Sequence, residues 1–255
     1  MFMSCGVESA AMVMPNRKSW LPLVSLAACL LLTCFNASAQ EQSFRVLLPS
    51  QGTPHPAVLF VPGCSGFSAN NGVNHYEERA AELRAAGYAV VFVDYIRRRL
   101  QSNCAHVSVA EVAQDIMEAA SWAREQPGVD RKRISVIGWS YGGGGVLAAL
   151  KAMPRDPPLE KAVMFYPVCR GAAPWSAAVV GLMLLGGKDD VAYPALCNPV
   201  VDGVPADRLR VITYPEARHG FDVRGLSEQA NVPGTPGYNA NAAKASWAAV
   251  MDFLQ

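Results

Sequence analysis

The sequence has little charge imbalance, few histidines and no recognisable metal-ligand spacing. Its 22 lysines and arginines almost balance its 21 aspartates and glutamates, so the formal net charge is +1. No extended basic block is present, which argues against nucleic acid as a partner, because phosphate binding needs clustered positive charge. No C-x-x-C motif or close histidine pair is found, and the sequence therefore predicts no metal site.

The chain also lacks internal repeats and any stretch long enough to form a second domain or a large cap. Its only apolar run outside the expected strands and helices lies near the N-terminus. Residues 17–18 are basic, residues 20–32 are apolar but too short to span a bilayer comfortably, and residues 37–39 form an A-x-A site. This pattern predicts a secretory signal peptide over residues 1–39, cleaved before Gln40, with Met14 as a possible true start.

Two other interpretations of this leader stay open. It could remain as a membrane anchor, which its short length and small exit residues disfavour. It could also be lipidated at Cys29, but residues 30–32 continue the apolar run where a mature lipoprotein normally becomes polar. Cleavage would leave 216 residues, which suits one domain over residues 40–255 with no stable membrane span. A periplasmic or secreted location follows from this interpretation.

Four cysteines remain after the leader: Cys64, Cys104, Cys169 and Cys197. An even number of cysteines in an exported chain indicates disulfides. Of the three possible pairings we favour Cys64–Cys104 and Cys169–Cys197, because the members of each pair follow adjacent predicted strands. The alternative is four buried free thiols.

Apolar runs alternate with helical patterns along the rest of the chain. The expected helices include one opened by a Ser108–Glu111 capping box and a last one over residues 239–254. The expected strands cover residues 44–48, 57–61, 88–94, 134–137, 161–166, 179–185 and 208–214. This alternation predicts an α/β fold with a doubly wound, mostly parallel sheet flanked by helices.

Residues 138–142, Gly-Trp-Ser-Tyr-Gly, fit the G-x-S-x-G pattern between an expected strand and an expected helix. A nucleophile elbow needs this context, because the serine sits at a sharp strand-to-helix turn with its hydroxyl exposed. The pattern therefore predicts Ser140 as a nucleophile. The alternative is a tight turn without a catalytic function.

A serine nucleophile needs a histidine base and a carboxylate that orients it. His219 is the only one of the four histidines that follows Ser140, as the chain order serine, acid, histidine requires. The acid should come directly after the expected strand at residues 179–185. Asp189 is our choice. Asp190 is the alternative, because the sequence does not fix the position of the acid to within one residue.

An oxyanion intermediate needs preorganised donors, and the backbone N–H groups of Tyr141 and Cys64 are the expected pair. Cys64 is chosen because its loop follows an early strand. Trp139, Phe221 and Tyr95 are candidates for the lining of a substrate groove, although core packing is an equally good explanation of such aromatic residues.

Four motifs carry a resemblance to the α/β-hydrolase superfamily and, within it, to the dienelactone hydrolase family. They are VPGCSG at residues 61–66, GWSYGG at 138–143, GGKD at 186–189 and HGF at 219–221. Dienelactone hydrolases carry cysteine at the elbow, so Ser140 favours ordinary ester cleavage over dienelactone hydrolysis. The glycine run at residues 142–145 also resembles that of bacterial cutinases and polyester hydrolases.

These features together predict an exported serine hydrolase that cleaves carboxylic esters through an acyl-enzyme on Ser140, with the triad Ser140, Asp189 and His219. This mechanism implies no metal or organic cofactor. The expected substrate is a small-molecule or polymeric ester. Alternatives are a lactone, thioester or polyester hydrolase with the same triad, or a non-catalytic binding protein of the same fold.

Overall fold

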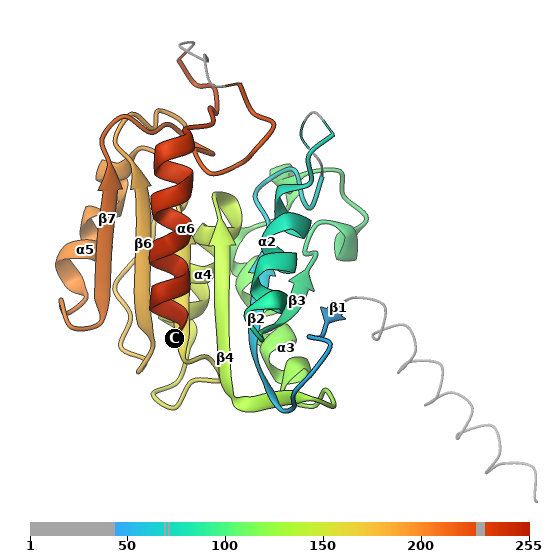
Figure 1. Ribbon diagram of the computed structural model, residues 1–255. Coiled ribbons are helices and arrows are strands. Elements are labelled where there is room, and N and C mark those ends of the chain that lie inside the picture. Colours follow the sequence, from blue (N-terminus) through green and yellow to red (C-terminus); the bar gives the residue numbers. More distant parts are fainter. Residues whose placement is uncertain (1–43, 69, 71, 228–232) are drawn as a thin grey trace, which may run out of the picture. The chain divides into compact units, whose positions relative to one another are not determined.

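Within the residues that the structure describes, seven strands form one sheet in the order β1-β3-β2-β4-β5-β6-β7. Figure 1 shows the sheet with most of its strands labelled. The computed structural model describes residues 44–68, 70, 72–227 and 233–255; the expected leader, with Met14, Cys29 and Gln40, lies outside them. β1 is antiparallel to β3, and the other neighbouring pairs are parallel. The strands are β1 (Phe44–Leu47), β2 (His55–Val61), β3 (Ala89–Val93), β4 (Val129–Trp139), β5 (Lys161–Phe165), β6 (Val180–Gly186) and β7 (Leu209–Tyr214). The predicted α/β fold class is confirmed.

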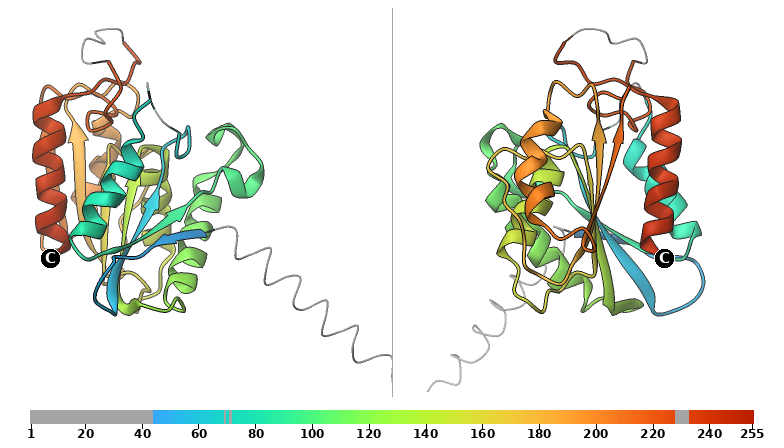
Figure 2. Two further views of the ribbon diagram at one scale, coloured as in Figure 1. Left: turned by 45° about the vertical axis from the view of Figure 1, so that its right-hand side comes forward. Right: turned by 90° about the vertical axis from the view of Figure 1, so that its left-hand side faces the viewer.

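Helices cover both faces of this sheet, as Figure 2 shows. They are α2 (His75–Ala85), α3 (Val109–Ala123), α4 (Tyr141–Ala152), α5 (Asn198–Gly203) and α6 (Ala240–Leu254). α2 and α6 pack on one face, and α3, α4 and α5 contribute to the core on the other. The sequence pattern predicts these helices except α5, whose six residues are too few to show a helical period.

Side-chain caps begin three of the helices. The Asn74 side chain accepts a hydrogen bond at the start of α2, and Asn239 does the same at α6. Ser108 and Glu111 form the predicted capping box at α3. Each cap satisfies backbone N–H groups that have no partner within the helix, which is why these elements begin at these residues.

The parallel strands place their carboxyl ends at one edge of the sheet. In Figure 1 the arrowheads of β4, β6 and β7 point toward the same side. The loops that follow β2, β4, β5, β6 and β7 therefore gather at this edge, where open α/β sheets bind their ligands.

A run of four glycines, residues 142–145, allows α4 to pack closely against its neighbours. A Cβ atom at Gly142 would lie 2.4 Å from the carbonyl oxygens of Val61 and Pro62. A Cβ atom at Gly145 would lie 2.3 Å from Cγ1 of Val112 on α3. Both distances are far below van der Waals contact, so the close approach of α4 to β2 and α3 requires glycine here.

We predict that Gly145→Ala lowers the free energy of unfolding by about 1–3 kcal/mol because the new methyl group overpacks the α3–α4 contact. This loss should appear even though alanine is intrinsically better than glycine in a helix by about 1 kcal/mol. Urea unfolding followed by circular dichroism measures it. Ala248→Gly, at an exposed position of α6, is the control and should lose about 1 kcal/mol from helix propensity alone. A Gly145→Ala protein as stable as the parent would contradict the packing argument.

Candidate active site

Ser140 lies at the turn between β4 and α4, with φ 52° and ψ −115°. This positive φ is unfavourable for a residue with a side chain and must be held by its surroundings. The Ser140 N–H donates to the carbonyl of Phe165 at 2.9 Å, and its carbonyl accepts from the N–H of Val168 at 3.1 Å. A Cβ at Gly138 would lie 2.8 Å from the Gly142 carbonyl oxygen, so the turn also depends on that glycine.

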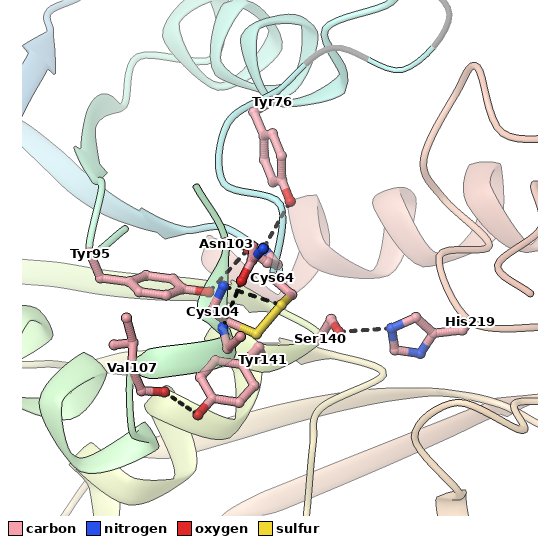
Figure 3. Close-up of a disulfide and its surroundings, with 11 residues drawn as sticks. Cys64, Tyr76, Tyr95, Asn103, Cys104, Val107, Ser140, Tyr141 and His219 are labelled. Carbon is pink, nitrogen blue, oxygen red and sulfur yellow. Dashed lines mark hydrogen bonds between the residues drawn. A yellow bond between two sulfur atoms is a disulfide. The ribbon is translucent and has the colours of Figure 1, made fainter. Parts of the chain in front are cut away.

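His219 comes from the loop after β7 and meets Ser140 across 79 positions of sequence. Its Nε2 atom lies 2.8 Å from Ser140 Oγ, and its Nδ1 atom lies 2.8 Å from Asp189 Oδ2. Figure 3 shows the Ser140 hydroxyl directed at the imidazole. The imidazole and the carboxylate are both buried. The structure thus brings the three predicted triad side chains into one hydrogen-bonded row.

The two adjacent aspartates of the β6 loop have different surroundings. The second carboxylate oxygen of Asp189 accepts hydrogen bonds from the N–H groups of Val191 at 2.9 Å and Ala192 at 2.8 Å. Asp190 instead accepts from the N–H of Gly234 at 2.9 Å and lies 3.6 Å from Nη1 of Arg218. Of the two, Asp189 is the one that contacts the imidazole, as the predicted orienting acid should.

The loop after β2 lies beside Ser140, and two buried tyrosines hold it. Gly63 donates its N–H to the Tyr76 hydroxyl at 3.0 Å and accepts from the Tyr95 hydroxyl at 3.0 Å. Burial raises the pKa values of both tyrosines above the ordinary value, so both hydroxyls stay protonated. A Cβ on Gly63 would be 3.5 Å from Ser140 Cβ, which shows how close this loop comes to Ser140.

Two disulfides fasten loops of the same edge, in the pairing favoured from the sequence. Cys64 is bonded to Cys104, and Cys169 is bonded to Cys197. The N–H of Cys104 also donates to the Cys64 carbonyl at 3.0 Å, so a covalent bond and a hydrogen bond both tie the β2 loop to the segment after β3, as Figure 3 shows.

Tyr141 is the first residue of α4, and its side chain also meets the segment after β3. Its hydroxyl donates to the Val107 carbonyl (Figure 3). The backbone N–H of Tyr141 lies at the N-terminus of α4, directly after Ser140. Cys64 lies in the loop after β2, the strand that pairs with β4. These are the positions that two oxyanion donors occupy in this kind of turn.

The predicted groove residues are not at an accessible surface, and this expectation is wrong. Trp139 is 1% exposed, and Tyr95 and Phe221 are fully buried. Trp139 stacks on Phe165 with ring centroids 5.5 Å apart, and Phe221 packs against Tyr166. The three side chains support the loops of the site from within and cannot line a groove, because sequence position next to a catalytic residue does not determine which way a side chain points.

Exposed apolar side chains follow Asp189 instead. Val191 is 45% exposed, Tyr193 is 57% exposed and Leu196 is 41% exposed. The only feature of the sequence that could have indicated this exposed apolar segment is the presence of large apolar residues in a loop.

A buried ionisable group behind the site was also missed. Asp222 accepts hydrogen bonds from Trp139 Nε1 at 3.0 Å and the Tyr166 hydroxyl at 2.6 Å, and its Oδ2 lies 3.2 Å from His75 Nε2. Burial opposes ionisation, but the interaction with His75 and the hydrogen bonds donated by Tyr166 and Trp139 outweigh it and hold the pKa of Asp222 below the ordinary carboxyl value. An aspartate three residues after His219 was the available clue.

Within the described ranges, no cluster of three or more histidine, cysteine, aspartate or glutamate side chains is placed to hold a metal ion. In the same part of the chain, no helix has both the length and the apolar character needed to cross a membrane.

The strand order and the elbow at the end of β4 define an α/β-hydrolase fold, and solved structures share it. A putative dienelactone hydrolase from Klebsiella pneumoniae is 20% identical with a TM-score of 0.68, over 83% of this chain and 91% of that one. A dienelactone hydrolase-like promiscuous phosphotriesterase from metagenomic libraries is 20% identical with a TM-score of 0.63, over 83% and 98%. A dienelactone hydrolase from Anabaena variabilis is 20% identical with a TM-score of 0.55, over 69% and 81%.

Residues 44–255 match the dienelactone hydrolase family, and the chain belongs to that family. It is accordingly a hydrolase. No curated protein sequence matched the chain.

We predict that removing either disulfide by paired Cys→Ser substitution lowers the free energy of unfolding by about 4 kcal/mol, because each bridge restricts the unfolded chain. The two bridges span 40 and 28 residues. Loop-closure entropy varies only with the logarithm of this length, so the two double variants should lose similar amounts. Guanidinium unfolding of both variants and the parent tests this, and each pair is the control for the other. An unchanged midpoint in either variant would contradict a stabilising bridge at that place.

Proposed function

We propose that this hydrolase cleaves carboxylic esters through an acyl-enzyme formed on Ser140. The observation that carries the proposal is the row of two 2.8 Å hydrogen bonds that joins Ser140 Oγ to His219 and His219 to Asp189. A serine hydroxyl is a poor nucleophile at neutral pH unless a base removes its proton as it attacks. The imidazole of His219 is within the distance that such a proton transfer needs.

In the first half-reaction, Ser140 Oγ attacks the ester carbonyl while its proton passes to Nε2 of His219. Asp189 accepts from Nδ1–H, which keeps Nε2 free as the base and stabilises the imidazolium that forms. Asp189 is itself held by the N–H groups of Val191 and Ala192, so its carboxylate keeps a fixed orientation. When the tetrahedral intermediate collapses, His219 returns the proton to the departing alcohol.

The negative oxygen of that intermediate is assigned to the backbone N–H groups of Tyr141 and Cys64. The tethering of the Cys64 loop by a disulfide and by the hydrogen bonds of Gly63 supports this assignment. Donors that are already fixed need no reorganisation as charge develops, which is the main source of their catalytic benefit. Water then attacks the acyl-enzyme with the same base and the same donors, and the two half-reactions balance without a cofactor.

The elbow residue bears on the substrate class. Members of this family with cysteine at the elbow act on dienelactone, and the hydroxyl of Ser140 favours simple carboxylic esters. The exposed Val191, Tyr193 and Leu196 lie in the segment after the proposed triad acid. They favour substrates with an apolar part, including the surface of a polymeric ester. Lactone and thioester cleavage would use the same residues, and a substrate panel separates them.

The site of action proposed for the chain is the periplasm or the extracellular medium. Two disulfides support this, because such bonds persist in oxidising compartments. The signal peptide proposed for residues 1–39 would direct the export, and N-terminal sequencing of the exported protein tests cleavage before Gln40.

We predict that Ser140→Ala removes turnover of short-chain nitrophenyl esters, by a factor on the order of 10⁶ in kcat, without loss of folding. Steady-state kinetics and a thermal unfolding scan measure the two effects. A fluorophosphonate probe should label the parent protein at Ser140 and leave the variant unlabelled. Undiminished turnover in the variant would exclude the mechanism. A parent protein that takes no label and cleaves no ester would favour a non-catalytic binding protein.

The two neighbouring aspartates offer a matched pair of variants. Asp189→Asn should lower kcat on the order of 10⁴-fold, because an amide can hold the imidazole in the wrong tautomer. Asp190→Asn makes the same chemical change one position later and should leave kcat at the parent value. Kinetics on one ester with both variants test this, and the reverse ranking would assign the triad acid to Asp190.

A further inference from the structure

Asp222 connects three segments of the active site from behind. Its carboxylate is fully buried, and its partners come from the end of β4, from the residue after β5 and from the start of α2. A buried carboxylate costs free energy unless it is paired and hydrogen-bonded, and here each oxygen has a polar partner. The ester-cleavage mechanism above does not use this group, so its presence needs another explanation.

Tyr166 is the partner that contacts the base. Its ring lies 4.7 Å from the His219 ring, centroid to centroid, in an edge-on arrangement. Its backbone has φ 35°, an unfavourable conformation for a tyrosine that the surroundings must impose. The Tyr166 hydroxyl donates to Asp222 Oδ1 at 2.6 Å, and burial together with the charge of Asp222 raises the pKa of Tyr166 well above its ordinary value, so this donor keeps its proton.

Trp139 is the partner that adjoins the nucleophile. Its indole N–H donates to Asp222 Oδ2 at 3.0 Å, and its backbone continues directly into Ser140. The orientation of the elbow turn is therefore coupled to the position of the same carboxylate that fixes Tyr166.

His75 connects Asp222 to the loop after β2, which contains Gly63 and Cys64. Its Nε2 lies 3.2 Å from Asp222 Oδ2, and the next residue, Tyr76, accepts the hydrogen bond from the N–H of Gly63. The Tyr76 ring also packs edge-on against Trp139, with centroids 5.2 Å apart. The nucleophile turn, the base and the loop with the proposed oxyanion donor thus share one buried anion as a common support.

We propose that Asp222 is a positioning residue that, through Tyr166, holds the His219 imidazole in line with Ser140. The proposal rests on the proposed esterase function. His219 Nε2 and Nδ1 are fixed in the ring plane by Ser140 and Asp189, but these two hydrogen bonds do not prevent the ring from tilting about the line between them. The Tyr166 ring, packed against the imidazole, opposes that tilt, and the hydrogen bond to Asp222 keeps Tyr166 in place.

Tyr166→Phe tests the proposal with the smallest possible change. It keeps the ring and removes only the hydroxyl that reaches Asp222. Tyr88→Phe is the matched control, because Tyr88 is also buried and its hydroxyl donates a single 2.9 Å hydrogen bond, to the carbonyl of Leu254 at the end of α6. Both variants lose one buried hydrogen bond, so a purely structural effect should lower their melting temperatures alike and leave the activity of the folded fraction unchanged.

The expected result is a fall of about tenfold to a hundredfold in kcat for Tyr166→Phe, with KM near the parent value, because a misaligned base slows the chemical step more than binding. The rate of fluorophosphonate labelling at Ser140 should fall in parallel. Tyr88→Phe should keep the parent kcat. All rates are divided by the concentration of active sites, so that unfolded protein does not contribute.

Asp222→Asn is the second variant. An amide at this position can still accept from the Tyr166 hydroxyl, but its NH₂ group cannot accept from Trp139 Nε1. We expect a lower kcat with little change in KM. Equal kcat values for Tyr166→Phe and Tyr88→Phe, with Ser140 of the parent labelled normally, would overturn the positioning proposal and leave the esterase proposal standing. A parent protein that is not labelled at Ser140 would overturn both.

Discussion

The close approach of three backbone segments around Ser140 is the constraint on which the site depends. The end of β4, the start of α4 and the loop after β2 come so near to one another that a methyl group at Gly142 would lie 2.4 Å from two carbonyl oxygens. This contact lets the Gly63 loop lie close to Ser140, whose φ is 52°. A looser junction would separate the serine from the donors proposed for its oxyanion.

Two groups of contacts elsewhere in the molecule restrain that junction. At the edge of the sheet, the two disulfides and the hydrogen bonds of Gly63 restrain the loops. Behind the edge, the buried carboxylate of Asp222 gathers polar side chains from distant segments. Both arrangements place polar groups where burial makes a hydrogen bond costly to break, so the loops are held in place.

The aromatic residues around the triad belong to this support. Trp139, Phe165, Tyr166 and Phe221 pack against one another in edge-on, tilted or stacked pairs beneath His219. The positions of Trp139 and Phe221 beside Ser140 and His219 in the sequence suggested a groove, and the burial of both side chains assigns them to the core. Exposed apolar side chains lie in the segment after Asp189, whose backbone also donates hydrogen bonds to the Asp189 carboxylate.

The sequence by itself determined the fold class, the order of the candidate catalytic residues along the chain, and the candidates Ser140 and His219. Strand and helix periods and the order of motifs are properties of the sequence alone, so they can be read without the structure. It also indicated both disulfides, since cysteines after adjacent strands end at the same edge. Only the tertiary structure distinguished Asp189 from Asp190, turned Trp139, Tyr95 and Phe221 inward, and assembled Asp222 with His75 and Tyr166. These outcomes depend on which way a side chain points and on what packs against it from distant segments, and no pattern in the chain records either.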